Sequence, residues 1–201
     1  SMQAGVADDG LGKGVAFADV NNDGFVDLYV SNKGGSNKLF LNKGDGSFKD
    51  VTATAGAGID SPGFTMGSVF GDYDNDGDVD LYLATGGQYE IEANRLFANN
   101  GDGTFTDVTE AAGVGLKEFT YSASFADYDN DGDLDVVISG TAGSQFQLFR
   151  NDGGMQFTDI SFGCGLGVCQ EVVCMSAADI DNDGDVDLFV GNHFALSQIF
   201  M

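Results

Sequence analysis

The stretch DYDNDGDVD at residues 72–80, followed at once by the apolar run LYL, decides the fold of this chain. Three close copies are DVNNDGFVD at 19–27, DYDNDGDLD at 127–135 and DIDNDGDVD at 179–187. Each copy has side-chain oxygens at positions 1, 3, 5 and 9 and a glycine at position 6. Oxygen ligands at alternating positions, folded back by a glycine, are what a hard cation such as calcium requires. The chain is therefore a repeat array, and we expect one ion in each repeat.

The predicted ligands follow from this spacing. Positions 1, 3, 5 and 9 would supply side-chain oxygens, whereas position 7 would supply its backbone carbonyl, so we expect its side chain to be free to vary. An ordinary acidic turn needs only one or two such side chains, which favours the metal interpretation. The predicted ligands of up to four Ca²⁺ are Asp19, Asn21, Asp23, Phe25, Asp27, Asp72, Asp74, Asp76, Asp78, Asp80, Asp127, Asp129, Asp131, Asp133, Asp135, Asp179, Asp181, Asp183, Asp185 and Asp187.

Two further features of these nine-residue loops refine the prediction. An EF-hand loop carries a glutamate at position 12, whereas all four copies have an apolar residue there, in phase with a strand. We therefore expect each site to lie between two strands and not between two helices. The first loop has three acids, whereas each of the others has five, and Asn21 replaces an acid. We therefore expect the first loop to bind calcium most weakly.

The charge of the chain excludes some partners. The formal net charge is -24, from 32 acidic and 8 basic residues, and more than half of the acids lie in the four loops. Without ions, these crowded carboxylates would repel one another. So acidic a surface argues against nucleic acid or an anionic membrane as a partner. No apolar run approaches the ~20 residues of a membrane-spanning helix, so no membrane insertion is expected.

Alignment of the four loops reveals a longer repeat. A run of small and apolar residues precedes each loop, and an apolar run follows it. Next come KLFLN (38–42), RLFAN (95–99), QLFRN (147–151) and QIFM (198–201), then, in the first three repeats, a Gly/Asp turn and KDVT, TDVT or TDIS. These segments predict four short strands per repeat, A to D, with the acidic loop between A and B. The repeats are approximately 14–66, 67–121, 122–173 and 174–201.

Four-stranded units that recur about every 50 residues are typical of a β-propeller. We therefore predict an all-β chain, a single propeller or propeller fragment over residues 1–201, with calcium-binding A–B loops. The fourth repeat ends within strand C, so the array is four repeats with the last incomplete. Two explanations stay open: a fragment of a longer propeller, or a homodimer in which two copies complete a larger ring.

The repeat resembles the FG-GAP/VCBS calcium-binding type found in integrin α-subunit propellers. The segment NRLFANNGDGTFTDVTEAAG at 94–113 is similar to the signature LFxNxGDGTFxDVTxxAG of the cartilage-acidic-protein-like branch. The resemblance covers nearly the whole chain. It implies a calcium-stabilised propeller, usually of seven blades, in secreted or cell-surface proteins.

No catalytic group is evident, so we expect no enzymatic activity. The lone histidine, His193, has no nucleophile assigned to it, and the aspartate pairs are better explained as metal ligands. Cys164, Cys169 and Cys174 lack a zinc spacing. They form either one local disulfide with a thiol left over, or three small, partly buried residues, which is the preferred interpretation.

The expected place for recognition follows from topology. In such a meander the B–C and D–A loops lie at the end opposite the acidic loops, and their sequences differ between repeats. We predict a secreted or cell-surface binding module for adhesion or for glycan or protein recognition. The alternatives are a structural, self-assembling propeller fragment and an accessory domain of a larger extracellular enzyme. Aromatic residues suited to contact are Phe64, Tyr89, Phe119, Tyr121, His193 and Phe194. For each of these residues taken singly, packing between blades is the preferred interpretation.

Overall fold

The computed structural model describes residues 4–61, 63–86, 92–140, 146–162, 172–192 and 195–201. Strands dominate these residues, and they form antiparallel sheets of eight, four and three strands. The prediction of an all-β chain is confirmed. The longest helix in the described part of the chain, α1 (Thr109–Ala112), has four residues, and no helix there could cross a membrane.

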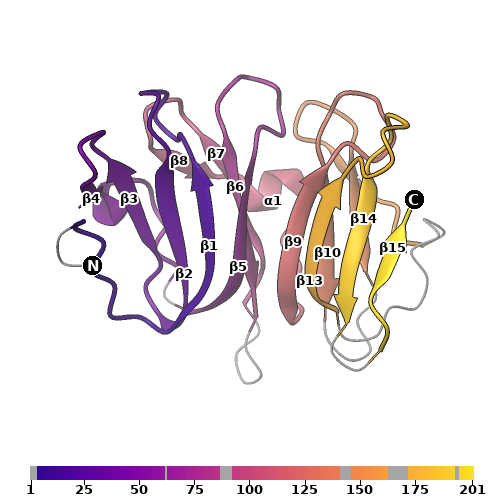
Figure 1. Ribbon diagram of the computed structural model, residues 1–201, viewed down its shortest axis with the longest axis horizontal. Helices are drawn as coiled ribbons and strands as arrows, with labels where there is room; N and C mark the ends of the chain where they lie inside the picture. The colour runs from indigo at the N-terminus through magenta and orange to yellow at the C-terminus, as the bar shows by residue number, and fades with distance from the viewer. Residues whose placement is uncertain (1–3, 62, 87–91, 141–145, 163–171, 193–194) are drawn as a thin grey trace.

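The strands form four successive units, each an antiparallel meander (Figure 1). Among the described residues the first three units have four strands and the last has three. Unit 1 contains β1 (Gly12–Ala18), β2 (Asp27–Gly35), β3 (Lys38–Asn42) and β4 (Phe48–Asp50), followed by the 3₁₀ turn Thr52–Thr54; unit 2 contains β5 (Gly63–Gly71), β6 (Asp80–Thr85), β7 (Arg95–Asn99) and β8 (Phe105–Asp107), followed by α1; unit 3 contains β9 (Thr120–Ala126), β10 (Asp135–Gly140), β11 (Gln147–Asn151) and β12 (Phe157–Asp159); unit 4 contains β13 (Val172–Ala178), β14 (Asp187–Asn192) and β15 (Gln198–Phe200).

The second strand of each unit shows how a unit depends on its neighbours. All six residues of β6 and all six of β10 are buried, because units 2 and 3 have another unit on each side. Strands covered on both faces are continuous apolar runs, as in LYL and VVI. In β2, by contrast, burial alternates along the first residues. Units 1 and 2 are also joined directly, because the end of β2 pairs with the start of β5.

The hydrophobic core lies between units and not within them. Three clusters of buried side chains occupy the contacts between units 1 and 2, 2 and 3, and 3 and 4. In the first two contacts a tyrosine of one unit meets a phenylalanine of the next edge to face, as Tyr29 meets Phe70 and Tyr82 meets Phe125, with ring centroids 6.4 Å apart in both pairs. In the third contact the smaller Val137 and Ala177 occupy these positions.

A second pair of positions links the units near the B–C loops. The side-chain amide of Asn37 donates to the Thr65 hydroxyl of unit 2 at 2.9 Å, and that of Asn94 donates to the Thr120 hydroxyl of unit 3 at 3.0 Å. In the third contact the polar pair is replaced by an apolar one. The corresponding side chains there, Phe146 and Val172, are buried in the same cluster.

The first strands of the four units lie next to one another in chain order, β1 on β5, β5 on β9 and β9 on β13. The acidic loops gather at the top of Figure 1, and the two ends of the described chain lie on opposite sides of the picture. Apolar side chains are exposed on both outer units. Phe17 of β1 is 62 % exposed and Ile199 of β15 is 51 % exposed.

Candidate metal sites

The A–B strand pairs bring the two ends of each acidic loop together. In unit 2, Gly71 at the end of β5 pairs with Asp80 at the start of β6, so positions 1 and 9 of the loop lie side by side. The pairs of Ala18 with Asp27, Ala126 with Asp135 and Ala178 with Asp187 repeat this register. Positions 1 and 9 are therefore neighbours in every unit, although seven residues lie between them in the chain.

Side-chain oxygens hold the loop backbone in a tight curve. In the second loop the Asp72 carboxylate accepts the backbone N–H groups of Asp76 and Gly77, each at 3.1 Å. The Asp76 carboxylate accepts the N–H of Asp78 at 2.8 Å. Gly77 has a φ of 94°, which a residue with a Cβ adopts only with strain. The first and third loops repeat these bonds, so one arrangement serves loops with three and with five acids.

The aspartate at position 9 is buried and joins the loop to strand C. The Asp80 carboxylate accepts the N–H of Tyr73 at 3.0 Å and the N–H of Asn99, on β7, at 2.9 Å. Asp27 and Asp135 make the same two kinds of bond, and Asp187 accepts the N–H of Ile180. This carboxylate therefore ties together three segments of its unit.

The protein balances the charge of these buried carboxylates only in part; near the third loop, Arg150 attracts Asp135. Burial raises the pKa of Asp80 to about 7 and that of Asp135 to about 6, and nearby aspartates of the same loops add to the rise. Burial also raises the pKa of Asp27. The N–H groups described above act in the opposite direction but are outweighed. A bound cation would stabilise the ionised form, so the electrostatics suit a metal ion.

Positions 1, 3 and 9 converge in three loops. Each of the triads Asp72–Asp74–Asp80, Asp127–Asp129–Asp135 and Asp179–Asp181–Asp187 has carboxylate oxygens within 4.8 Å of one another. Two oxygens that ligate one calcium ion at 2.3–2.6 Å lie at most about 5 Å apart. The donor set therefore fits a hard cation such as Ca²⁺. The first loop offers only two carboxylates at these positions, since Asn21 stands between Asp19 and Asp27.

The remaining predicted ligands are not part of these groups. The aspartates at position 5, such as Asp76, have an oxygen engaged with the backbone of position 7. Their role as ligands, and that of the position 7 carbonyls, stays a prediction.

The expectation that the position 7 side chain is free to vary is wrong for three of the four loops. The carboxylates of Asp78, Asp133 and Asp185 each accept a hydrogen bond from an asparagine of the preceding unit. Phe25 has no such partner in this chain, and its ring lies against Gly44 in the β3–β4 turn, where a Cβ would collide with it. Among the described residues, the three aspartates at position 7 have an asparagine partner and Phe25 does not.

Sequence reasoning missed two kinds of asparagine. One is at position 4 of every loop: Asn22, Asn75, Asn130 and Asn182. The other closes strand C, where the Asn99 side chain donates to the carbonyl oxygens of Val20 at 2.9 Å and Val79 at 3.0 Å. Asn151 donates in the same way to Tyr73 and Leu134. Both asparagines recur at fixed places in the repeat, and that recurrence was the available signal.

The other candidate residues are only partly described. Cys164, Cys169, Tyr89, His193 and Phe194 lie outside the described residues. Cys174 is exposed on β13 and its thiol is free. The rings of Phe119 and Tyr121 contact each other edge to face, with centroids 4.9 Å apart, and the Lys33 ammonium lies 5.5 Å from the ring centre of Phe64.

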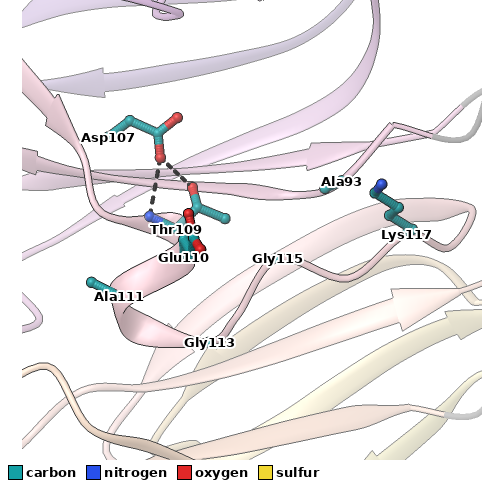
Figure 2. Close-up of a pocket in the computed structure, with 8 residues that line it drawn as sticks. All are labelled: Ala93, Asp107, Thr109, Glu110, Ala111, Gly113, Gly115 and Lys117. Carbon is teal, nitrogen blue, oxygen red and sulfur yellow. Dashed lines mark hydrogen bonds between the residues drawn. The ribbon is translucent and has the colours of Figure 1, made fainter.

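A groove lies beside α1, formed by the D–A linker and the B–C loop of unit 2. Its cavity volume is about 930 Å³. Figure 2 shows that one oxygen of the Asp107 carboxylate accepts hydrogen bonds from the backbone N–H and the hydroxyl of Thr109. Glu110 and Lys117 are exposed charged groups of the same groove. Unit 1 has a corresponding groove of about 510 Å³ next to Thr52. The residues that line the larger one are Ala93, Asp107, Thr109, Glu110, Ala111, Gly113, Gly115 and Lys117.

Comparison with protein families identifies the repeat. The model described as an FG-GAP-like repeat matches residues 19–83 and 72–138. Together these two matches span more than half of the chain. Each match starts at position 1 of one acidic loop and ends in the apolar run after the next loop.

Curated relatives match over almost the whole chain. Cartilage acidic protein 1 of Homo sapiens is 27% identical over 207 residues, which cover 98% of this chain and 31% of the relative. The Xenopus tropicalis protein of the same name is 29% identical over 202 residues, covering 93% of this chain and 30% of the relative. The chain thus spans about a third of the length of these relatives.

One solved structure, of an Agrocybe aegerita lectin described as specifically recognising non-reducing terminal N-acetylglucosamine, is 22% identical with a TM-score of 0.49. The match covers 87% of this chain and 45% of the lectin chain.

The strand C asparagine yields a test of the inter-unit contact. Asn99→Ala is expected to lower the free energy of unfolding by about 2 kcal/mol, because one buried and one partly buried carbonyl group lose their donor. The matched control is Asn42→Ala, since Asn42 donates only to Val26 in its own unit, in an exposed bond. It should cost less than about 1 kcal/mol. Urea denaturation at one fixed calcium concentration measures both; equal losses would contradict the inter-unit role.

Proposed function

The chain belongs to the FG-GAP-like repeat family, and on that premise we propose that it is a calcium-stabilised binding module. The observation that carries the proposal is the convergence of three aspartate carboxylates in each of three successive loops. We propose that Asp19, Asn21 and Asp27, together with position 5 and the carbonyl of position 7, form a weaker fourth site of the same kind. The proposed role of calcium in these sites is structural, because the position 9 carboxylate that would bind it also joins the loop to strand C.

We further propose that the four units are arranged as blades of a β-propeller, within the single domain 1–201 predicted from the sequence. Support comes from the first strands, which lie next to one another in chain order, as the innermost strands of propeller blades do. The cores between units also support it, since units 2 and 3 each use both faces to contact neighbours.

The proposed binding face is the end with the B–C and D–A loops. Variable loops on a rigid scaffold are where recognition normally lies, and the groove beside α1 opens among them. Its exposed Glu110 and Lys117 suit hydrogen bonds to a glycan or to a protein segment. We propose a secreted or cell-surface location, because loops of this kind fill at the calcium concentrations found outside cells. An accessory role beside a catalytic domain is the alternative, and we assign no catalytic step to this segment.

Calcium binding and stability are the first test. Up to four Ca²⁺ should bind per chain, with dissociation constants on the order of 10⁻⁴ to 10⁻³ M. Each site filled at a hundredfold excess over its dissociation constant should add about 2.7 kcal/mol to the free energy of unfolding. Calorimetry counts the ions, and melting with calcium or EDTA measures the stabilisation. A folded protein that takes up no calcium would refute the proposal.

Two matched variants assign the effect to particular loops. Asp76→Ala removes position 5 from a five-acid loop, and Asp23→Ala removes it from the three-acid loop. In calcium, Asp76→Ala should lose more stability, because the more acidic loop binds its ion more tightly. In EDTA, Asp76→Ala should lose no more stability than Asp23→Ala, because both side chains are exposed and the more acidic loop is relieved of more repulsion. A larger loss for Asp76→Ala that persists in EDTA would mean that these residues act without an ion.

The binding face is tested with arrays of glycans and of extracellular proteins. A bound ligand should lose about tenfold or more in affinity with Lys117→Ala or Glu110→Ala, as expected when a charged hydrogen bond is removed. Lys43→Ala is the matched control, because Lys43 is exposed in the β3–β4 turn at the acidic-loop end. Loss of binding in the control, or no binding to any array member, would contradict the proposed face.

Self-assembly is the second candidate, favoured by the exposed apolar side chains on the outer units. Phe17 occupies the place on β1 that Phe70 occupies on β5, but it is 62 % exposed. Two copies that complete a larger ring would cover it. Such a ring would, however, set Asn182 of one copy against Phe25 of the other, whose side chain offers no acceptor. Light scattering at micromolar concentration decides: a stable particle of 20.9 kDa means that this homodimer does not form.

A further inference from the structure

The acidic loops are joined into a chain by hydrogen bonds between successive units. The side-chain amide of Asn22 donates to the Asp78 carboxylate at 2.5 Å, that of Asn75 donates to Asp133 at 2.7 Å, and that of Asn130 donates to Asp185 at 2.6 Å. In every case position 4 of one loop reaches position 7 of the next. The Asn75 amide also contacts the Gly132 carbonyl at 3.2 Å.

Both ends of these bonds lie at residues that an ion would fix. Position 4 stands between positions 3 and 5, two proposed ligands of its own loop. It has a positive φ, 57° at Asn22 and 58° at Asn75 and Asn130, a conformation that asparagine tolerates better than most residues. Position 7 is the residue whose carbonyl is the proposed ligand in the next loop. An ion that shapes one loop therefore sets the donor that holds a ligand residue of its neighbour.

A second, buried connection runs beside the first. The Asp80 carboxylate accepts the N–H of Asn99, and the Asn99 side chain donates to the Val20 carbonyl in the first loop at 2.9 Å. The N–H of Val20 in turn donates to the Asp27 carboxylate at 3.0 Å. Position 9 of one loop is thus connected to position 9 of the preceding loop through two residues. Asp135, Asn151, Tyr73 and Asp80 repeat the connection between the third and second loops.

We propose that neighbouring calcium sites are coupled through these bonds, so that an ion in one acidic loop raises the calcium affinity of the adjacent loops. This coupling rests on the proposed calcium binding. The asparagines at position 4 are positioning residues, and each acts on the calcium site of the next loop along the chain. Coupling free energies between sites are reciprocal, so each ion strengthens its neighbours in both directions. An ordered loop also leaves less conformational freedom for its neighbour to lose.

Charge alone would produce the opposite sign. Each bound ion reduces the negative potential at the neighbouring loop, which weakens the attraction of the next ion. Salt screens this effect between exposed charges. Positive coupling at physiological ionic strength must therefore come from the bonded contacts between units, and its loss on removal of a single donor identifies the contact responsible.

The experiment removes one donor without straining the backbone. Asn75→Gly deletes the amide, and glycine adopts the positive φ of this position freely. Asn182→Gly is the matched control, because Asn182 has the same position and a φ of 61° but no acidic loop follows it in this chain. Calcium titration calorimetry at physiological ionic strength gives the affinity and steepness of binding. Melting in EDTA measures the stability of each calcium-free variant.

The wild type should bind calcium more steeply than independent sites do. Asn75→Gly should flatten the titration and lower the overall affinity by about fivefold or more, the lower end of coupling between sites. Asn182→Gly should leave both unchanged. Equal effects of the two variants, or a lower melting temperature of Asn75→Gly with an unchanged titration, would overturn the coupling while leaving calcium binding intact. No calcium uptake by the wild type would overturn coupling and calcium binding together.

Discussion

The rest of the structure depends on one buried aspartate per repeat. The carboxylate at position 9 accepts backbone N–H groups from the acidic loop and, in the first three units, from strand C, while it opens strand B. It sets the register of the A–B pair, the curve of the loop and the place of the third strand. The same carboxylate converges with positions 1 and 3 in three loops, so the residue that organises the unit also forms its candidate metal site.

Packing between units supplies what a four-stranded sheet lacks. A single unit has two apolar faces, and the three clusters of buried side chains lie where neighbouring faces meet. At the positions near the B–C loops, the two side chains that meet across each contact are either both polar or both apolar. Where Asn94 meets Thr120 the pair is polar, and where Phe146 meets Val172 it is apolar. Buried polar groups must be paired, so these positions change together or not at all.

The acidic-loop end of a unit and the opposite end, with the B–C and D–A loops, differ in how constant their sequences are. At the acidic-loop end, loops of near-constant sequence are bonded to their neighbours. At the other end, loops of different sequence surround the groove beside α1, whose Asp107 and Thr109 are occupied with each other. Constant bonds on one side hold the units in place, and variable side chains such as Lys117 on the other are free to differ without loss of the fold. This separation of constant and variable loops suits the proposed binding module.

The sequence by itself determined the repeat, the all-β class, the strands A to D and the loops in which Asp72, Asp74 and Asp80 converge, because local spacing fixes each of them. Only the tertiary structure decided the roles of Asn75, Asp133 and Asn99. The bond from Asn75 to Asp133 joins residues 58 apart and that from Asn99 to Val20 joins residues 79 apart, so no pattern within one loop contains them. Phe25 made position 7 look variable in the sequence. The asparagine partners of the position 7 aspartates lie in the preceding units, so only the packing of one unit on the next reveals them.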